Sequence, residues 1–257
     1  MKSKIQGCPL CGTKDYTVVG RFEINALVDS WIKRKNFNPI PDIYKDDFLE
    51  KRFCNSCGLY FYNFHISDSE ELYQKLQESS DYYPVSKIAY QMAVETIKDS
   101  KANNLLEVGS GNGSFLELAR YIVPKVVGSE YNKNAAKLCC DRGLEVLAQD
   151  AFQTSEQFDV ICHFEVLEHI FDTKSFIQEI LRLLRKGGKL IISVPDPKGI
   201  AFASESNPLL FPPHHQFDFS RATFDWLANK FALKMVEYKE VLDERLYARQ
   251  FVVFEKE

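Results

Sequence analysis

The sequence predicts an α/β protein whose larger part is a mostly parallel, seven-stranded sheet with helices on both faces, joined to a small N-terminal module with four cysteines. Two observations carry this prediction. From Leu105 onwards, short apolar runs alternate with helix-like segments, which is typical of a parallel sheet covered by helices. Before that point, a cysteine–x–x–cysteine–glycine pattern occurs twice. We therefore expect one domain at 1–84 and a second at 85–257.

The elements of the larger part follow from apolar periodicity and from its interruptions. The predicted strands are 105–108, 126–129, 145–148, 158–163 and 189–194, followed by a terminal strand pair at 233–241 and 248–255. The predicted helices are 87–100, 114–121, 134–142, 173–185 and 221–231. Glycine at 143 ends one helix and proline at 195 stops one strand. In the first part, a strand is expected at 59–62 and a helix at 69–77.

Composition limits the classes of function. The 257 residues are 45% hydrophobic and 26% charged, with a formal net charge of -4, which is ordinary for a globular protein. The acidic balance does not favour a nucleic-acid partner or an anionic membrane surface. We find no apolar run of membrane-spanning length and no apolar centre of a signal peptide in the first residues. The sequence therefore predicts a cytoplasmic protein, and it leaves a homodimer open.

The four cysteines of the first part predict a structural zinc site. Cys8 and Cys11 form one pair, Cys54 and Cys57 form the other, and each pair is followed by a glycine. Four thiolates are a usual ligand set of structural zinc, and a two-residue spacer lets both sulfurs of a pair face one ion. The alternative is a redox pair, which is less favoured because such pairs occur singly. We interpret the other three cysteines, at 139, 140 and 162, as packing residues.

The stretch around which the larger part is organised reads LLEVGSGNGSFLELA, from Leu105 to Ala119. It predicts a buried strand, a glycine turn and a helix. Glycines allow the tight turn and a close approach of a ligand to the backbone. Their G-x-G-x-G spacing differs from the dinucleotide fingerprint G-x-G-x-x-G. The carboxylate of Glu107, just before them, suits a cationic ligand better than a pyrophosphate. This stretch resembles motif I of class I S-adenosylmethionine-dependent methyltransferases.

Ligands of parallel sheets bind beyond the carboxyl ends of the strands. The residues found there are candidates for cofactor binding. After the first strand come Gly109, Ser110, Gly111 and Gly113; after the second come Glu130, Tyr131 and Asn132; after the third come Asp150, Ala151 and Phe152; and after the fourth comes Phe164. Glu130 could accept both hydroxyls of a ribose, Asp150 could accept an adenine amino group, and Phe152 could flank the ring.

The resemblance extends through most of the larger part. The strings VVGSEYN, AQDAF, FDVICHFEVLEHI and LRKGGKLIISVP look like the successive motifs of small-molecule class I methyltransferases. The paired cysteines look like the zinc-binding module of bacterial sugar methyltransferases. The resemblance implies a Rossmann-like fold, S-adenosylmethionine as cofactor and a zinc ion in the module. It also implies a sugar- or phosphate-bearing small molecule as the acceptor.

Methyl transfer needs alignment of the reacting groups and, for many acceptors, a base. Histidine is the commonest base near neutral pH. His169 follows the fourth strand, and His214 and His215 lie in the long segment 195–219, which by resemblance covers the substrate. We expect His169 or His215 to be the general base. Three further side chains are expected to orient the acceptor: Tyr82, Tyr83 and Glu165. An acceptor that is already an anion would need no base.

The sequence therefore predicts a methyltransferase with O-methylation of a nucleotide-linked sugar, or of another activated precursor of a surface (capsular) polysaccharide, as the favoured reaction. Transfer to nitrogen or carbon is less favoured. One alternative is a zinc-ribbon RNA methyltransferase, supported only by the basic run at 33–35. Another is a non-catalytic zinc- and nucleotide-binding protein. The aromatic insertion between the cysteine pairs, 22–51, is interpreted as a helical or irregular segment that packs on the rest of the protein.

Overall fold

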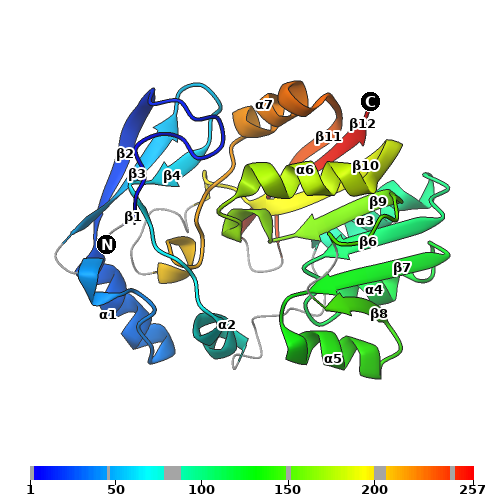
Figure 1. Ribbon diagram of the computed structural model, residues 1–257, viewed down its shortest axis with the longest axis horizontal. Helices are drawn as coiled ribbons and strands as arrows, with labels where there is room; N and C mark the ends of the chain where they lie inside the picture. The colour runs from blue at the N-terminus through cyan, green and yellow to red at the C-terminus, as the bar shows by residue number, and fades with distance from the viewer. Residues whose placement is uncertain (1–2, 45–46, 78–87, 149–151, 200–206, 244–246) are drawn as a thin grey trace. The chain divides into compact units, whose positions relative to one another are not determined.

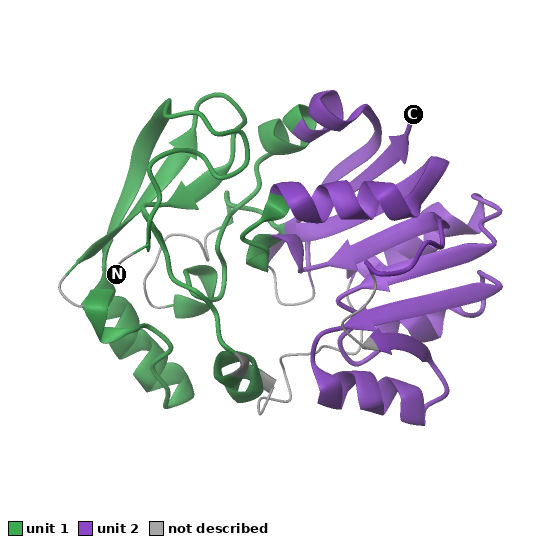
Figure 2. Ribbon diagram, in the orientation of Figure 1, with its two compact units in different colours: residues 1–82, 168–173, 195–226 green, residues 83–167, 174–194, 227–257 purple. Residues whose placement is uncertain are grey.

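The structure is a computed structural model that describes residues 3–44, 47–77, 88–148, 152–199, 207–243 and 247–257. The chain forms two compact units (Figure 2). The first contains residues 1–82, 168–173 and 195–226, and the second contains 83–167, 174–194 and 227–257. The first unit thus takes in two segments from the middle and late parts of the chain, which a simple division at residue 84 does not include. The domain limits 1–84 and 85–257 stay a prediction.

The second unit contains the seven-stranded sheet, in the order β11-β12-β10-β9-β6-β7-β8 (Figure 1). Its strands are β6 (Asn104–Val108), β7 (Lys125–Glu130), β8 (Glu145–Ala148), β9 (Phe158–Phe164), β10 (Leu184–Pro195), β11 (Leu233–Leu242) and β12 (Ala248–Lys256). The pairs from β10 to β8 run parallel, and β11 pairs antiparallel with β12. The predicted mostly parallel sheet and the terminal strand pair are confirmed.

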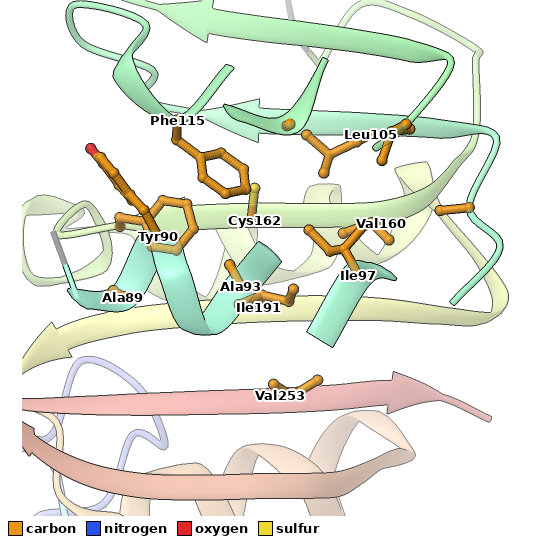
Figure 3. Close-up of a cluster of buried hydrophobic side chains, with 14 of the residues drawn as sticks. Ala89, Tyr90, Ala93, Ile97, Leu105, Phe115, Val160, Cys162, Ile191 and Val253 are labelled. Atoms are coloured by element: carbon orange, nitrogen blue, oxygen red, sulfur yellow. The ribbon is translucent and has the colours of Figure 1, made fainter. Parts of the chain in front are cut away.

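Helices cover both faces of this sheet. They are α3 (Ile88–Lys98), α4 (Ser114–Ala119), α5 (Lys133–Asp141) and α6 (Thr173–Leu183); α7 (Arg221–Phe231) crosses the boundary between the units. On one face, α3 and α4 direct Tyr90 and Phe115 onto Leu105 and Cys162 of the strands (Figure 3). The next residue of β9 points to the other face, where the ring of His163 lies edge-on to Phe176 of α6.

One strand is longer than predicted. We expected a helix to continue to residue 185 and a strand to begin at Lys189, but the helix ends at Leu183 and β10 begins at Leu184. Leu184 pairs with Phe158, and the register shifts before Lys189 pairs with Val160. The glycines at 187 and 188 explain this, because Gly187 has a φ of 74° and a Cβ at Gly188 would lie 2.8 Å from a backbone oxygen.

The first unit combines small antiparallel sheets with two helices. β2 (Tyr16–Glu23), β3 (Phe48–Cys54) and β4 (Tyr60–Tyr62) form one sheet; β1 (Ser3–Lys4) and β5 (Phe64–His65) form another. The helices are α1 (Ile24–Lys35) and α2 (Glu70–Gln77), with 3-10 turns η1 (Asp42–Tyr44), η2 (Leu167–His169, which begins in the second unit) and η4 (Pro208–Leu210). Helix α1 lies in the aromatic insertion, and its Trp31 is fully buried, as the packing interpretation predicts.

The described end of the segment after β10, residues 207–219, packs into the core of the first unit. Phe211 belongs to the same buried cluster as Trp31, and its ring lies edge-on to Phe22 at 4.8 Å between centroids. Phe217 and Phe219 are also buried. This stretch is therefore part of the core of the first unit, and its role in covering a substrate stays a prediction. Within the described part of the chain, no helix has both the length and the apolar character needed to span a membrane.

Candidate functional site

The glycine turn after β6 is shaped by backbone bonds to the neighbouring strand. The N–H groups of Gly109 and Ser110 both donate to the carbonyl of Ser129 in β7, at 2.8 and 2.9 Å. Gly109 has a φ of 73°, and a Cβ added there would lie 2.5 Å from Cγ2 of Val166. Both the dihedral angle and the contact demand glycine at this position. The turn is thus a tight loop at the carboxyl edge of the sheet, as predicted.

Glu130, the last residue of β7, holds this turn in place. Its Oε2 accepts a hydrogen bond from the N–H of Gly111 at 2.7 Å, and its Oε1 accepts one from the N–H of Asn132 at 2.8 Å. The side chain is 8% exposed. Burial raises the pKa of the carboxyl group, and the backbone donors act in the opposite direction. Because each carboxylate oxygen has two lone pairs, Glu130 retains acceptor capacity for a ligand hydroxyl.

The neighbours of Glu130 have different roles. Asn132 caps α5, since its side-chain oxygen accepts from the N–H groups of Asn134 and Ala135 at 2.7 and 3.1 Å. Tyr131 is 74% exposed, so its ring is open to a ligand or to solvent. On the adjacent strand, Glu107 is 1% exposed and lies in front of the glycine turn. A buried carboxylate at this position fits a cationic group of a ligand.

The remaining cofactor candidates divide into three cases. Asp150 and Ala151 lie outside the described residues. Phe152 is partly buried, with its ring edge-on to Phe176 at 5.7 Å. The ring of Phe164 is 4% exposed and packs edge-on against Phe115 at 4.8 Å, so it serves the core and offers little surface to a ligand. The cofactor contacts of these residues stay predictions.

Glu165 stands just after β9 with a φ of 58°, in the left-handed region that residues other than glycine seldom adopt. Its Oε1 accepts from the hydroxyl of Ser193 at 3.1 Å, and its Oε2 pairs with Nε of Arg249 at 3.0 Å. A second nitrogen of Arg249 pairs with Asp243 at 3.1 Å. Sequence reasoning missed Ser193 and Arg249. A polar residue near the end of an apolar strand was the available signal for Ser193, whereas Arg249 offered none.

The structure brings the three histidine candidates together in the first unit. One ligand nitrogen from each of His169, His214 and His215 lies within 4.8 Å of the other two. Nδ1 of His169 is 2.7 Å from the carbonyl of His214, and Nδ1 of His214 is 2.8 Å from the carbonyl of Leu209. Burial, the nearby His169 and Lys35 lower the pKa of His214 well below its usual range, so its imidazole is neutral at pH 7. Tyr82 and Tyr83 lie outside the described residues.

The four cysteines of the first part also meet. Sγ of Cys8 is 3.5 Å from Sγ of Cys57, and Sγ of Cys11 is 3.5 Å from Sγ of Cys54. All four sulfurs lie within 4.8 Å of one another, and all four are free thiols. Tetrahedral zinc–sulfur bonds of about 2.3 Å would place the sulfurs about 3.8 Å apart. The cluster therefore has the size that a four-thiolate zinc site requires.

Three thiols of this cluster have shifted pKa values. The hydrogen bond from Cys57 lowers the pKa of Cys8 to about 5, whereas burial raises the pKa of Cys11 to about 11. The same bond to Cys8 raises the pKa of Cys57. In the hydrogen-bonded pair of Cys8 and Cys57, therefore, Cys8 is the thiolate when no cation is bound. A divalent ion would make it favourable for all four sulfurs to lose their protons.

Comparison of the sequence with known protein families identifies the family of the chain. A sequence profile described as a methyltransferase domain matches residues 77–238. The match covers well over half of the chain. The chain belongs to the methyltransferase-domain family. The resemblance predicted from the motifs is confirmed at this level, while the sugar-methyltransferase type and the zinc ion stay predictions.

Individual relatives cover only parts of the chain. Ubiquinone biosynthesis O-methyltransferase of Ruegeria sp. strain TM1040 is 32% identical over 133 residues, which is 45% of this chain and 54% of that protein. An uncharacterized protein of Methanocaldococcus jannaschii is 29% identical over 124 residues, 47% of this chain and 58% of that protein. The chain thus spans about half the length of the curated relatives it matches.

Among solved structures, the N-methyltransferase NodS from Bradyrhizobium japonicum WM9, in complex with S-adenosyl-L-homocysteine, has a similar fold. The TM-score is 0.54 with 19% identity, and the alignment covers 72% of this chain and 97% of NodS. At this identity the likeness shows the fold alone. The predicted Rossmann-like architecture is therefore confirmed.

Proposed function

We propose that the protein transfers a methyl group from S-adenosylmethionine to a small polar acceptor. The observation that carries the proposal is the glycine turn pinned by Glu130 at the carboxyl edge of a parallel sheet, in a chain that belongs to the methyltransferase-domain family. This edge is where parallel sheets bind their ligands. The cofactor, when bound, supplies a methyl group already activated by a sulfonium.

The residues present fit that cofactor. Glu107, buried beside the turn, would balance the ammonium group, and Glu130 would accept from the ribose hydroxyls while it holds Gly111. Gly109 and Gly113, both with positive φ, let the turn fold tightly at this edge of the sheet. Tyr131 is exposed next to Glu130 and can cover one face of the nucleoside.

For the acceptor, we propose a nucleotide-linked sugar or another activated precursor of a surface polysaccharide, methylated on oxygen. This part is supported only by the resemblance of the cysteine module and of the motifs to sugar methyltransferases. A cytoplasmic location and a small-molecule partner rather than a nucleic acid or a membrane belong to the same proposal. The acidic composition supports them, with a formal net charge of -4.

We also propose that Cys8, Cys11, Cys54 and Cys57 hold a structural zinc ion. The spacing of the sulfurs supports this, and a complete four-thiolate site leaves no position open for chemistry. The second cysteine pair is anchored to its surroundings, because the hydroxyl of Ser220 donates to the carbonyl of Gly58 at 2.8 Å. Loss of the ion would therefore loosen the start of α7 as well as the module.

Where the acceptor must lose a proton, His169 or His215 is our candidate for the base. In its neutral form, His169 donates Nδ1–H to the carbonyl of His214, so Nε2 is the nitrogen of this ring that can accept a proton. The test is transfer of a labelled methyl group to a panel of nucleotide-linked sugars, simple sugars and RNA. Turnover with a sugar nucleotide supports the proposal, whereas labelling of RNA alone would replace it with the RNA alternative.

A further inference from the structure

The histidine cluster of the first unit has a geometry that its role as a base does not require. The ring centroids of His169, His214 and His215 are separated by 4.5, 4.8 and 4.9 Å, so each ring is a neighbour of the other two. His214 is 6% exposed and His215 7%. A general base needs one imidazole. Three imidazoles that converge in a buried place are instead the arrangement of a metal site.

The hydrogen bonds of the cluster set the tautomers that a metal needs. A carbonyl oxygen can only accept, so Nδ1 of His169, facing the His214 carbonyl, must carry the proton. The same holds for Nδ1 of His214, which faces the Leu209 carbonyl. In the neutral form of each ring the lone pair then lies on Nε2. Metal-binding histidines show this pattern, with one nitrogen on the ion and the other donating to a carbonyl or carboxylate.

The backbone around the cluster holds the ligands in place before any ion binds. The carbonyl of Glu168 accepts from the N–H groups of Gln216 and Phe217 at 2.8 and 3.3 Å, which ties η2 to the segment that carries the other two histidines. The side-chain amide of Gln216 donates to the carbonyls of Pro213 and Ile66 at 2.8 and 3.0 Å. Hydrogen bonds thus join the two chain segments directly beside the imidazoles.

The carboxyl group of Glu168 lies next to the cluster. Oε1 of Glu168 is 3.9 Å from Nε2 of His169, and the Glu168 side chain is 2% exposed. A divalent ion bound by the three imidazoles would draw the ligand nitrogens to about 3.3 Å from one another, as expected for nitrogens bound to zinc at about 2.0–2.1 Å. The nitrogens already lie within 4.8 Å of one another, so only a small movement of the rings is needed.

We propose that His169, His214 and His215 form a binding site for a divalent transition-metal ion of the zinc type, separate from the four-cysteine site. Imidazole ligands suit zinc, nickel, copper or iron rather than magnesium or calcium. Three protein ligands leave a coordination position for an oxygen of water or of a small molecule. Occupancy of the site does not depend on the proposed methyl transfer. Its use in lowering the pKa of an acceptor oxygen, in place of a histidine base, does rest on that function.

The test is titration of the chelator-treated full chain with Co²⁺, followed by absorption spectroscopy. A four-thiolate site gives strong sulfur-to-cobalt charge-transfer bands together with intense d–d bands, whereas a three-histidine site adds only weaker d–d bands and no sulfur charge transfer. We expect the wild type to bind two equivalents of Co²⁺, one with each kind of signal. His169→Gln and His215→Gln should each weaken binding of the second equivalent at least tenfold, since loss of one ligand lowers affinity strongly, and should leave the charge-transfer bands unchanged.

The matched control is His65→Gln, which removes a histidine of the same unit whose ring stacks on Phe171 at 3.6 Å. It should leave both signals intact. The proposal is overturned if the wild type binds a single equivalent of Co²⁺, with no added d–d absorption once the charge-transfer bands are saturated, or if the cluster variants bind Co²⁺ with wild-type affinity at the second site. The wild-type spectrum decides the matter even if a variant fails to fold. The readout needs neither cofactor nor acceptor, so failure of the proposed methyl transfer would be seen separately, as absent turnover.

Discussion

His163 makes a quantitative prediction about stability against pH. Its side chain is fully buried in β9, and neither ring nitrogen has a hydrogen-bond partner among the residues that the structure describes. Burial lowers the pKa of His163 from 6.5 to about 3. The folded state therefore keeps the ring neutral, while the unfolded chain binds a proton as the pH falls below 6.5. The contribution of the neutral ring to the free energy of unfolding is fully present above pH 6.5 and is lost progressively as the pH falls to about 3.

The size of the effect follows from that difference. At pH 5 the unfolded chain gains about 2 kcal/mol from protonation of this ring, while the folded chain gains almost nothing. His163→Leu removes the titration and also two buried polar atoms that lack partners, so at pH 7 it should be as stable as the wild type or more stable.

The assay is urea unfolding of both proteins at pH 7 and pH 5. The wild type should lose about 2 kcal/mol more than the variant between these pH values. Release of metal from cysteines at low pH affects both proteins equally and cancels in the difference. An equal loss in the two proteins would refute the reasoning, because it would mean that the ring is protonated or solvated in the folded state.

Two further predictions follow. Gly109→Ala should be severely destabilising and should abolish binding of S-adenosylhomocysteine, because the new Cβ would lie 2.5 Å from Val166 at a φ of 73°. The matched control is Gly143→Ala, where φ is 74° and a Cβ would have no neighbour within 4 Å. The control should lower the free energy of unfolding in urea by only about 1 kcal/mol. Equal effects of the two substitutions would contradict the role of the Val166 contact. Removal of zinc by a strong chelator should lower the midpoint of thermal unfolding of the wild type. Cys11→Ser, which lacks one ligand, should show this lower midpoint without any chelator. A wild-type midpoint that does not respond to chelation would count against the structural zinc ion.

Much of the second unit could be predicted because its signals are local. Short apolar runs that alternate with helix-like segments located the strands of the parallel sheet, and Gly109 and Pro195 marked the ends of two of them. The end of α6 was misplaced because a bulge at Gly187 and Gly188 lets β10 begin earlier. A pair of glycines after a periodic stretch favours a helix end, and sequence alone does not show whether a strand has already begun.

The site could be predicted only in part. Its residues were found because each follows a strand, but their contacts depend on the folded chain. Glu130 was expected to serve a ribose, and the structure shows that it also holds the N–H of Gly111. The bond joins residues nineteen positions apart, which no local pattern reveals. The convergence of His169 with His214, forty-five residues later, was likewise invisible in the sequence, where only a shared role as base was expected.

The most direct test of the central claim is calorimetric titration of the purified protein with S-adenosylhomocysteine, compared with Glu130→Gln, Glu130→Ala and the exposed control Glu95→Gln. We predict binding to the wild type and to the control. Glu130→Gln, which keeps one acceptor oxygen, should bind more weakly, and Glu130→Ala, which releases Gly111, should bind weakest. Absence of binding to the wild type would contradict the account, because the Rossmann-like unit would then have a ligand other than this cofactor.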